Sequence, residues 1–411
     1  MSAAVGLLVT ACGGATVATT TTTDTGHVTN VANSQTQVTA EELRITLEQQ
    51  LGQHALLAIE AMRAGVAGQE HYDAAAAALG KNTEDLTESI RLVYGDEAAS
   101  KFNTLWTNHI GFFVDYTTGL AKGDKAKQQK ALKQLDQYRQ DFGAFLEGAT
   151  NGKLTQSAVA ELLQHHVDQL VSQIDAYHAG DYQRAAAIER EAYAHMFETA
   201  QGLASAIVST QDGFAGSVEG QAVDLRSSLG QLLGEHAQLA MEAMRSGVAG
   251  EKDFNAIAGA LNDNTEDLTA AMSSVFGEEG GQAFMKMWAN HIDFFVQYTV
   301  GLAEGDKAAQ DAALKRLEQY RQDFAQFLDT ASQGNIPSEV VAESLQSHVN
   351  QLVEQVKTFH AGDYQTAFST GDEAYSHMYH TAEALSAGIV AFMGGEMPSG
   401  GVETGAGGTA K

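Results

Sequence analysis

The chain has 411 residues and a net charge of −28, from 52 acidic and 24 basic side chains. This charge excludes nucleic acid as an expected partner, because such binding depends on Lys and Arg neutralising phosphates. Anionic lipid surfaces are disfavoured for the same reason. Only 2 prolines occur, and Ala, Leu, Gln and Glu are abundant, so the composition favours helix.

The N-terminal stretch carries the only cysteine, Cys12, so an internal disulfide and a Cys-based zinc site are both excluded. A short apolar run ends in Val9-Thr10-Ala11-Cys12-Gly13, which resembles a lipobox, the bacterial signal whose cysteine becomes lipidated. The run is too short to span a bilayer. Secretory signals open with Lys or Arg, whereas the first basic residue here is Arg44, a departure that a start upstream of Met1 would explain. We therefore predict a lipoprotein, secreted and anchored to the outer face of the cell membrane through Cys12; the alternative is a fortuitous apolar N-terminus.

A tandem repeat fills the centre of the chain. "NTEDLT" occurs at Asn82 and Asn264, and "QYRQDF" occurs at Gln137 and Gln319, so both motifs return after 182 residues (264 − 82 and 319 − 137). Each copy has the size of one domain, which indicates duplication of a whole domain. The expected parts are a signal and Thr-rich tether (1–39), repeat 1 (40–212), repeat 2 (222–393) and a disordered tail (394–411).

Apolar residues at steps of three and four predict helices throughout each repeat. In repeat 1 the helical segments cover residues 40–65, 70–95, 96–124, 125–150, 155–180 and 181–208. This pattern gives about six helices, or four main helices with two shorter ones, and shows no strand signal. The predicted fold is all-α, with two tandem helical bundles. Glycines in 216–220 predict a linker and independently folding repeats, whereas one long helix from Glu191 to Met244 is the alternative.

Four histidines in each repeat fall on predicted apolar helix faces. They are His54, His109, His166 and His195 in repeat 1, matched by His236, His291, His348 and His377 in repeat 2. A bundle can gather one histidine from each of several helices at its axis, and imidazole suits copper, zinc and iron. We expect His54, His109 and His195 to converge on a metal. Met62 and Met196 would add thioether ligands, and "NTEDLT" would add oxygen ligands.

The same residues are also compatible with roles that involve no metal. A histidine on an apolar face is commonly a hydrogen-bonded core residue, and paired methionines commonly fill gaps in a core. Asn82 fits equally well as the cap of a helix that starts there. The bundle core could also bind an organic ligand. His27, His71, His165 and His380 lack a histidine at the matching position of the other repeat and receive no role.

The repeated pattern also carries a family resemblance. The motifs "GxHAxLAxxAMxxGxxG", "NHIxFFVxYT" and "HAGDY", which recur in both repeats, resemble a helical domain of secreted Gram-positive bacterial proteins often labelled copper amine oxidase-like. The resemblance covers about residues 40–392 and implies a secreted helical protein, with copper as the metal it suggests. It does not imply the oxidase reaction, because the chain lacks the Asn-Tyr pair that such an enzyme needs to form its quinone cofactor.

No common catalytic motif stands out in the chain, since Gly-x-Ser-x-Gly and phosphate-binding loops are absent from the sequence. We therefore expect no catalytic activity. The sequence predicts a cell-envelope lipoprotein that binds a transition metal, copper first, through core histidines. The alternative is a structural or protein-interaction module with a partner at the cell surface.

Overall fold

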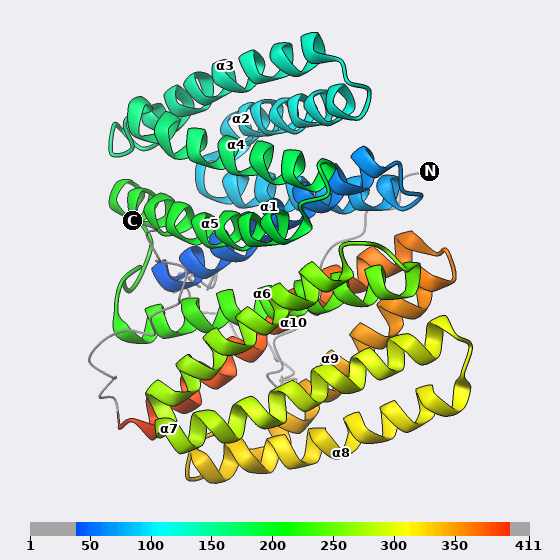
Figure 1. Ribbon diagram of the computed structural model, residues 1–411. Coiled ribbons are helices and arrows are strands. Elements are labelled where there is room, and N and C mark those ends of the chain that lie inside the picture. The colour runs from blue at the N-terminus through cyan, green and yellow to red at the C-terminus, as the bar shows by residue number, and fades with distance from the viewer. Residues whose placement is uncertain (1–37, 395–411) are drawn as a thin grey trace, which may run out of the picture. The chain divides into compact units, whose positions relative to one another are not determined.

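The computed structural model describes residues 38–394, which form ten α-helices and no strand (Figure 1). The predicted all-α fold is therefore confirmed. The helices of repeat 1 are α1 (Ala40–Ala67), α2 (Tyr72–Ala121), α3 (Lys125–Ala149), α4 (Gln156–His178) and α5 (Tyr182–Thr210). Those of repeat 2 are α6 (Gln221–Ala249), α7 (Phe254–Ala303), α8 (Lys307–Ala331), α9 (Ser338–His360) and α10 (Tyr364–Phe392). Helices α7 to α10 begin and end 182 residues after α2 to α5. The predicted signal, with Cys12, and residues 395–411 of the predicted tail lie outside the described residues.

Short caps determine where the helices begin and end. Thr39 accepts a hydrogen bond from the backbone N–H of Glu42, whose side chain accepts one from the backbone N–H of Thr39, so α1 begins with a reciprocal capping box. It ends at Gly68, whose φ of 68° lies in the left-handed region that favours glycine. Asp124 and Asp181 cap α3 and α5 through their carboxylates, which leaves only short turns between the helices.

Each repeat contains five helices where the sequence predicted about six. The segments expected over 70–95 and 96–124 join into the single 50-residue helix α2, which is kinked at Gly95. The φ of Gly95 is 81°, and Gly277 has a φ of 76° at the matching place in α7. Glycine adopts this conformation without the steric cost that a side chain would add, and both repeats have a glycine at the kink.

The "NTEDLT" motif lies inside α2 and does not start a helix. Asn82 is buried and donates from its Nδ2 to the carbonyl of Gln50 on α1, at 2.9 Å. Asn264 makes the matching bond to Leu232 of α6, at 3.0 Å. The motif thus ties the second helix of each repeat to the first, and the interpretation of Asn82 as a helix cap is wrong.

The helices of each repeat pack in the same order. In repeat 1, α1 contacts α2 and α5, α3 contacts α2 and α4, and α4 also contacts α5. In repeat 2 the corresponding contacts join α6, α7, α8, α9 and α10 in the same pattern. The expected apolar stripe of α1, from Leu43 to Met62, is buried in the resulting cores. None of the helices within residues 38–394 has an apolar stretch long enough to cross a membrane.

Contacts between the two repeats are reciprocal. The helix α1 meets its counterpart α6, while α5 contacts α7 and α10 contacts α2. Where the repeats meet, a Cβ added to Gly234 of α6 would lie 2.6 Å from the hydroxyl of Tyr193 of α5, so the backbone there approaches closely. Residues 38–394 accordingly fall within one compact unit. The sequence-based expectation of separately folding repeats did not include this shared interface.

The segment between the repeats is not helical. Helix α5 ends at Thr210 and α6 begins at Gln221, with bends and extended residues between them. The alternative of one helix from Glu191 to Met244 is therefore wrong. The glycines of this segment end one repeat and begin the next, as the sequence indicated.

Candidate metal centre

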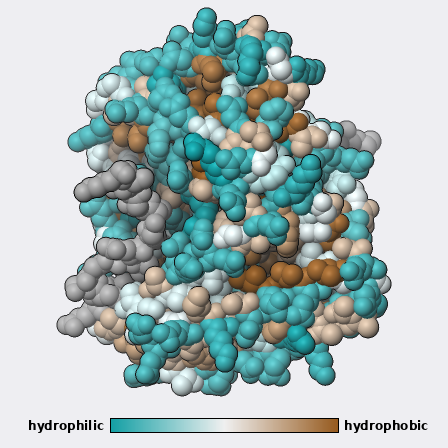
Figure 2. All heavy atoms as spheres, viewed as in Figure 1, coloured by the Kyte–Doolittle hydropathy of each residue, from teal (hydrophilic) through white to brown (hydrophobic). Residues whose placement is uncertain are grey.

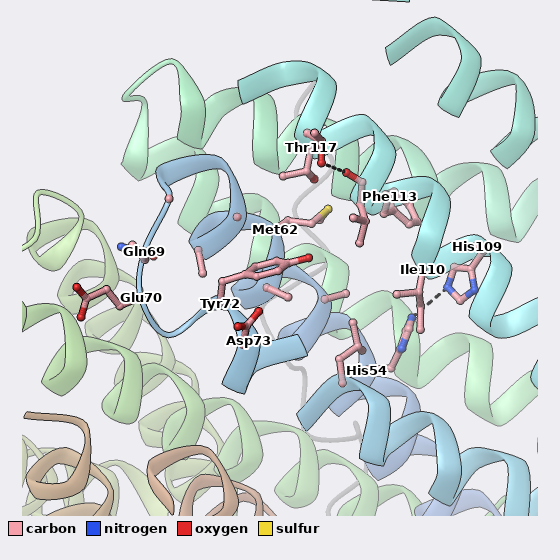
Figure 3. Close-up of a pocket in the computed structure, with 18 residues that line it drawn as sticks. His54, Met62, Gln69, Glu70, Tyr72, Asp73, His109, Ile110, Phe113 and Thr117 are labelled. Carbon is pink, nitrogen blue, oxygen red and sulfur yellow. Dashed lines mark hydrogen bonds between the residues drawn. The ribbon is translucent and has the colours of Figure 1, made fainter. Parts of the chain in front are cut away.

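Three histidines from three helices meet in the core of repeat 1. His54 comes from α1, His109 from α2 and His166 from α4, and their exposed fractions are only 1%, 2% and 5%. One ring nitrogen of each lies within 4.8 Å of one from each of the others. The Nε2 atoms of His54 and His109 are 3.3 Å apart and face each other (Figure 3). The sequence placed all three on apolar faces, and the fold brings them together.

Aromatic rings hold this histidine triad in place. Trp106, one turn before His109, lies 4.6 Å from the His54 ring and 4.7 Å from the His109 ring, between centroids. Tyr138 of α3 stacks on His109 at 4.7 Å with an interplanar angle of 14°. The "NHIGFFVDYT" motif therefore places its histidine on the same buried stripe as Trp106 and Phe113. Packing against these rings restricts how the imidazoles can turn.

Repeat 2 contains the same arrangement. His236, His291 and His348 are buried, and their ring nitrogens also lie within 4.8 Å of one another. The ring centroids of His236 and His291 are 5.3 Å apart, the same separation as for His54 and His109. Tyr320 stacks on His291 as Tyr138 stacks on His109. The two triads thus have the same arrangement of histidine and tyrosine rings.

The triad histidines are held in their neutral form. Burial, with a smaller contribution from neighbouring His166, lowers the pKa of His109 to about 3. Burial and a neighbouring histidine likewise lower the pKa of His291 and His348 to about 3, and the pKa values of His54 and His236 fall well below the usual range. Each ring keeps a free lone pair at neutral pH. Neutral imidazole is the form that coordinates a metal.

The Nδ1 atoms of all six triad histidines make no hydrogen bond of good geometry among the described residues, although a weaker contact with the backbone of Trp106 raises the pKa of His109 in part, and one with Trp288 does so for His291. In repeat 2, Nε2 of His236 also has no hydrogen-bond partner within residues 38–394. A buried polar atom without a partner costs free energy. A cation held between the Nε2 atoms of His54 and His109 would leave the Nδ1 atoms of these two rings without a partner. Metal-ligating histidines usually donate their other N–H to a carbonyl or carboxylate. Here aromatic packing takes the place of that support.

A cavity leads to each triad. In repeat 1 a cavity of about 420 Å³ is lined by His54 and His109 together with apolar residues such as Met62 and Phe113. Figure 3 shows Tyr72 lying across this cavity, with Glu70 and Asp73 farther from the histidines. A matching cavity of about 280 Å³ reaches His236 and His291. A small ligand or hydrated ion has a route to both sites.

Repeat 2 has a further cavity, of about 390 Å³, on the other side of its triad. It is lined mainly by apolar side chains of α6, α7, α9 and α10 and reaches His236, His291 and His348. Figure 2 shows a row of hydrophobic residues over the second repeat on the face viewed. The apolar lining of this cavity suits an apolar ligand next to the triad of repeat 2.

His195 does not complete the triad with His54 and His109, contrary to expectation, and His166 does. His195 and the exposed His165 have their Nδ1 atoms 3.4 Å apart, and Nε2 of His195 lies 3.3 Å from the carbonyl of Leu162. His377 likewise lies outside the second triad, with its Nε2 2.9 Å from the carbonyl of Ser344. His166, His195 and His377 all lie on apolar faces, but the orientation of α4 about its axis turns His166 towards His54 and His109. Met62 lines the triad cavity, whereas Met196 packs in the apolar core.

Sequence reasoning missed a cluster of buried charges between the repeats. Arg63 contacts Glu60, Glu189 and Glu242 through its guanidinium, and Arg245 lies 3.5 Å from Glu60. The signal was present, because "EAMR" places Glu and Arg among apolar residues near the C-terminal end of α1 and again near that of α6. Charges at such positions are rarely left unpaired.

Comparison with known proteins gives no match, whether with family models, with curated proteins or with solved structures.

Proposed function

We propose that each repeat binds one transition-metal ion through its three buried histidines, with copper as the first candidate and zinc or iron as the others. The spacing of the ligand atoms carries this proposal. Two nitrogens bound to a tetrahedral metal at about 2.0–2.1 Å lie about 3.3–3.4 Å apart. The Nε2 atoms of His54 and His109 are separated by 3.3 Å.

The chemistry of the site supports the same proposal. All three side chains of each triad are imidazoles, which suit copper, zinc, nickel and iron. Their pKa values lie below the usual range, so no proton competes with the metal at neutral pH. Three protein ligands leave one position open, and in each repeat a cavity borders the triad. The chain would hold two ions.

The proposal includes a location at the cell envelope. The apolar run that ends at Cys12 supports lipidation of this cysteine, and a lipid would tether the bundles outside the cell. Detergent should then release the protein from membranes, and Cys12→Ser should make it soluble without detergent. Unlipidated wild-type protein in the cytosol would contradict this part of the proposal.

A structural or protein-interaction role at the cell surface is the second candidate. It is favoured by the Nδ1 atoms of His54 and His166, which lack the carbonyl or carboxylate partners typical of metal-ligating histidines. On this view the rings act as core side chains, stacked on Trp106 and Tyr138. The two candidates differ in whether the purified protein holds metal.

Metal analysis of the purified protein, followed by titration with Cu(I), Cu(II), Zn(II) and Fe(II), tests the proposal. Two triads predict a metal-dependent rise in melting temperature, because a ligand specific to the folded state stabilises it. His109→Gln combined with His291→Gln should abolish this rise. The control is His178→Gln with His360→Gln, which changes exposed histidines at the ends of α4 and α9. No thermal shift with any of these ions would leave the structural role.

A further inference from the structure

A second group of histidines lies outside the triads, between α4 and α5 of repeat 1. The Nδ1 atoms of His165 and His195 are 3.4 Å apart, and the rings meet nearly edge to face, with centroids separated by 4.5 Å. His195 is largely buried, whereas His165 is exposed. The contact therefore lies at the surface, where an ion from solution can reach it.

The hydrogen bond of His195 fixes which of its nitrogens is free. Its Nε2 lies 3.3 Å from the carbonyl oxygen of Leu162, and only a protonated nitrogen can donate to a carbonyl. A neutral ring that donates through Nε2 carries its lone pair on Nδ1, the nitrogen that faces His165. A backbone carbonyl on one nitrogen and a free lone pair on the other is the usual arrangement of a metal-ligating histidine.

The distance between the two Nδ1 atoms fits a shared metal. Ligands at about 2.0–2.1 Å from a tetrahedral ion lie about 3.3–3.4 Å apart, and the observed separation is 3.4 Å. Glu198, one turn after His195, has a carboxylate oxygen 4.0 Å from Nδ1 of His195. Its side chain is 83% exposed and can rotate to complete the ligand set.

We propose that His165, His195 and Glu198 form a separate surface site for a divalent transition-metal ion. Two imidazoles and one carboxylate are a common zinc ligand set, and water would fill the remaining position. The site shares no residue with either triad, so it does not depend on metal binding in the core.

Repeat 2 has different residues at the corresponding positions. Ser347 replaces His165, and its hydroxyl donates to the carbonyl of Glu343. His380 replaces Glu198. His377 keeps its hydrogen bond to a backbone carbonyl, here that of Ser344. No imidazole of α9 faces it, whereas His165 of α4 faces His195. The proposed site therefore belongs to repeat 1 and gives the two repeats different metal capacities.

Zinc titration of the full chain by calorimetry tests this site separately from the triads. In a background of His109→Gln and His291→Gln, one zinc equivalent should remain. Adding His165→Ser, the residue found in repeat 2, should weaken that binding at least about tenfold, and Glu198→Gln should weaken it less, because an amide is a poorer ligand than a carboxylate. His178→Ser, at another exposed position of α4, serves as the control and should change nothing.

The outcomes distinguish the two proposals. If the wild type binds one zinc ion that His165→Ser removes, the surface site stands and the triads do not bind. If zinc binding in the triad-deficient background is unchanged by His165→Ser, the surface site is overturned, whatever the triads do. Because His165 is exposed, its replacement should leave the melting temperature of the metal-free protein unchanged, which confirms that the variant is folded.

Discussion

Arg63 of the first repeat donates to Glu242 of the second at 2.6 Å, and both side chains are buried. The same guanidinium reaches Glu189 at 2.9 Å. Removing charges from water costs several kcal/mol for each ion, and only close pairing offsets this cost. The buried charges of each repeat are therefore stabilised by those of the other, so the interface links the stability of the two repeats.

Arg63→Ala should destabilise the protein strongly. The substitution leaves the buried carboxylate of Glu242 without its cation, and it removes the same partner from Glu189, whose pKa burial raises well above its usual range. Breaking a buried pair in this way costs about 3–5 kcal/mol. Denaturation by urea would measure the loss. Lys81→Ala is the control, because Lys81 pairs with Asp85 on an exposed helix face, where a pair contributes at most about 1 kcal/mol. Equal effects of the two substitutions would contradict the interpretation of the buried cluster.

Gly52→Ala should also destabilise the protein. A Cβ there would lie 2.7 Å from Tyr193 and 3.0 Å from the hydroxyl of Tyr375, both of which are buried. Overpacking of this kind costs about 1–3 kcal/mol. Gly80→Ala provides the contrast, because a Cβ at this position in α2 meets nothing within 4 Å and alanine favours helix by about 0.5–1 kcal/mol. Thermal melts should move in opposite directions for the two variants.

Sequence periodicity predicted the parts of this structure that depend on neighbours along the chain. The stripe through Trp106, His109 and Phe113 is buried as expected, because residues three and four apart share one face of a helix. The 182-residue offset likewise predicted that a second triad would accompany the first. Local spacing therefore placed the histidines on the correct faces.

Relationships between helices could not be predicted in the same way. His166 and His195 both lie on apolar faces, and only the rotation of α4 and α5 about their axes decides which one joins His54. The contact of Arg63 with Glu242 depends on how one repeat packs against the other. The orientation of a helix about its axis and the packing of one repeat against the other are both set by contacts over the whole surface of a helix. A spacing along the chain carries no information about either.

The metal-free protein should lose stability as the pH falls below neutrality. The pKa values of His109, His291 and His348 are about 3 in the folded state and 6.5 when exposed, so the unfolded chain binds more protons between these values. Stability is then fully present above pH 6.5 and declines as the pH falls towards 3, by about 1.4 kcal/mol per pH unit for each histidine.

Urea denaturation of chelator-treated protein at several pH values would measure this decline. The double variant His109→Gln and His291→Gln should show a shallower dependence on pH, because glutamine does not titrate. The exposed pair His178→Gln and His360→Gln should keep the wild-type slope. An identical slope in all three proteins would show that the triad histidines are not held neutral by the fold.

The two repeats should be unstable apart and should reassociate when mixed. A chain divided after Glu219 separates α5 from α6 and leaves Val218 with the apolar core of repeat 1. The division exposes Arg63 on one half and Glu242 on the other, together with the hydroxyl of Tyr193, which lies 3.1 Å from that of Tyr375 in the intact protein. Each half loses partners that its buried polar groups need, so each should unfold at lower urea than the intact chain.

Co-expression of the halves followed by size-exclusion chromatography would detect their association, and urea denaturation would compare the complex with each half. The complex should be more stable than either half, because binding that is specific to the folded state stabilises it. Arg63→Ala in the first half should weaken association, whereas Lys81→Ala should not, since the exposed Lys81 pairs with Asp85 of its own helix. Halves that are as stable alone as the intact chain, and that do not associate, would show that the repeats are independent domains and that the buried charges between them contribute nothing to folding.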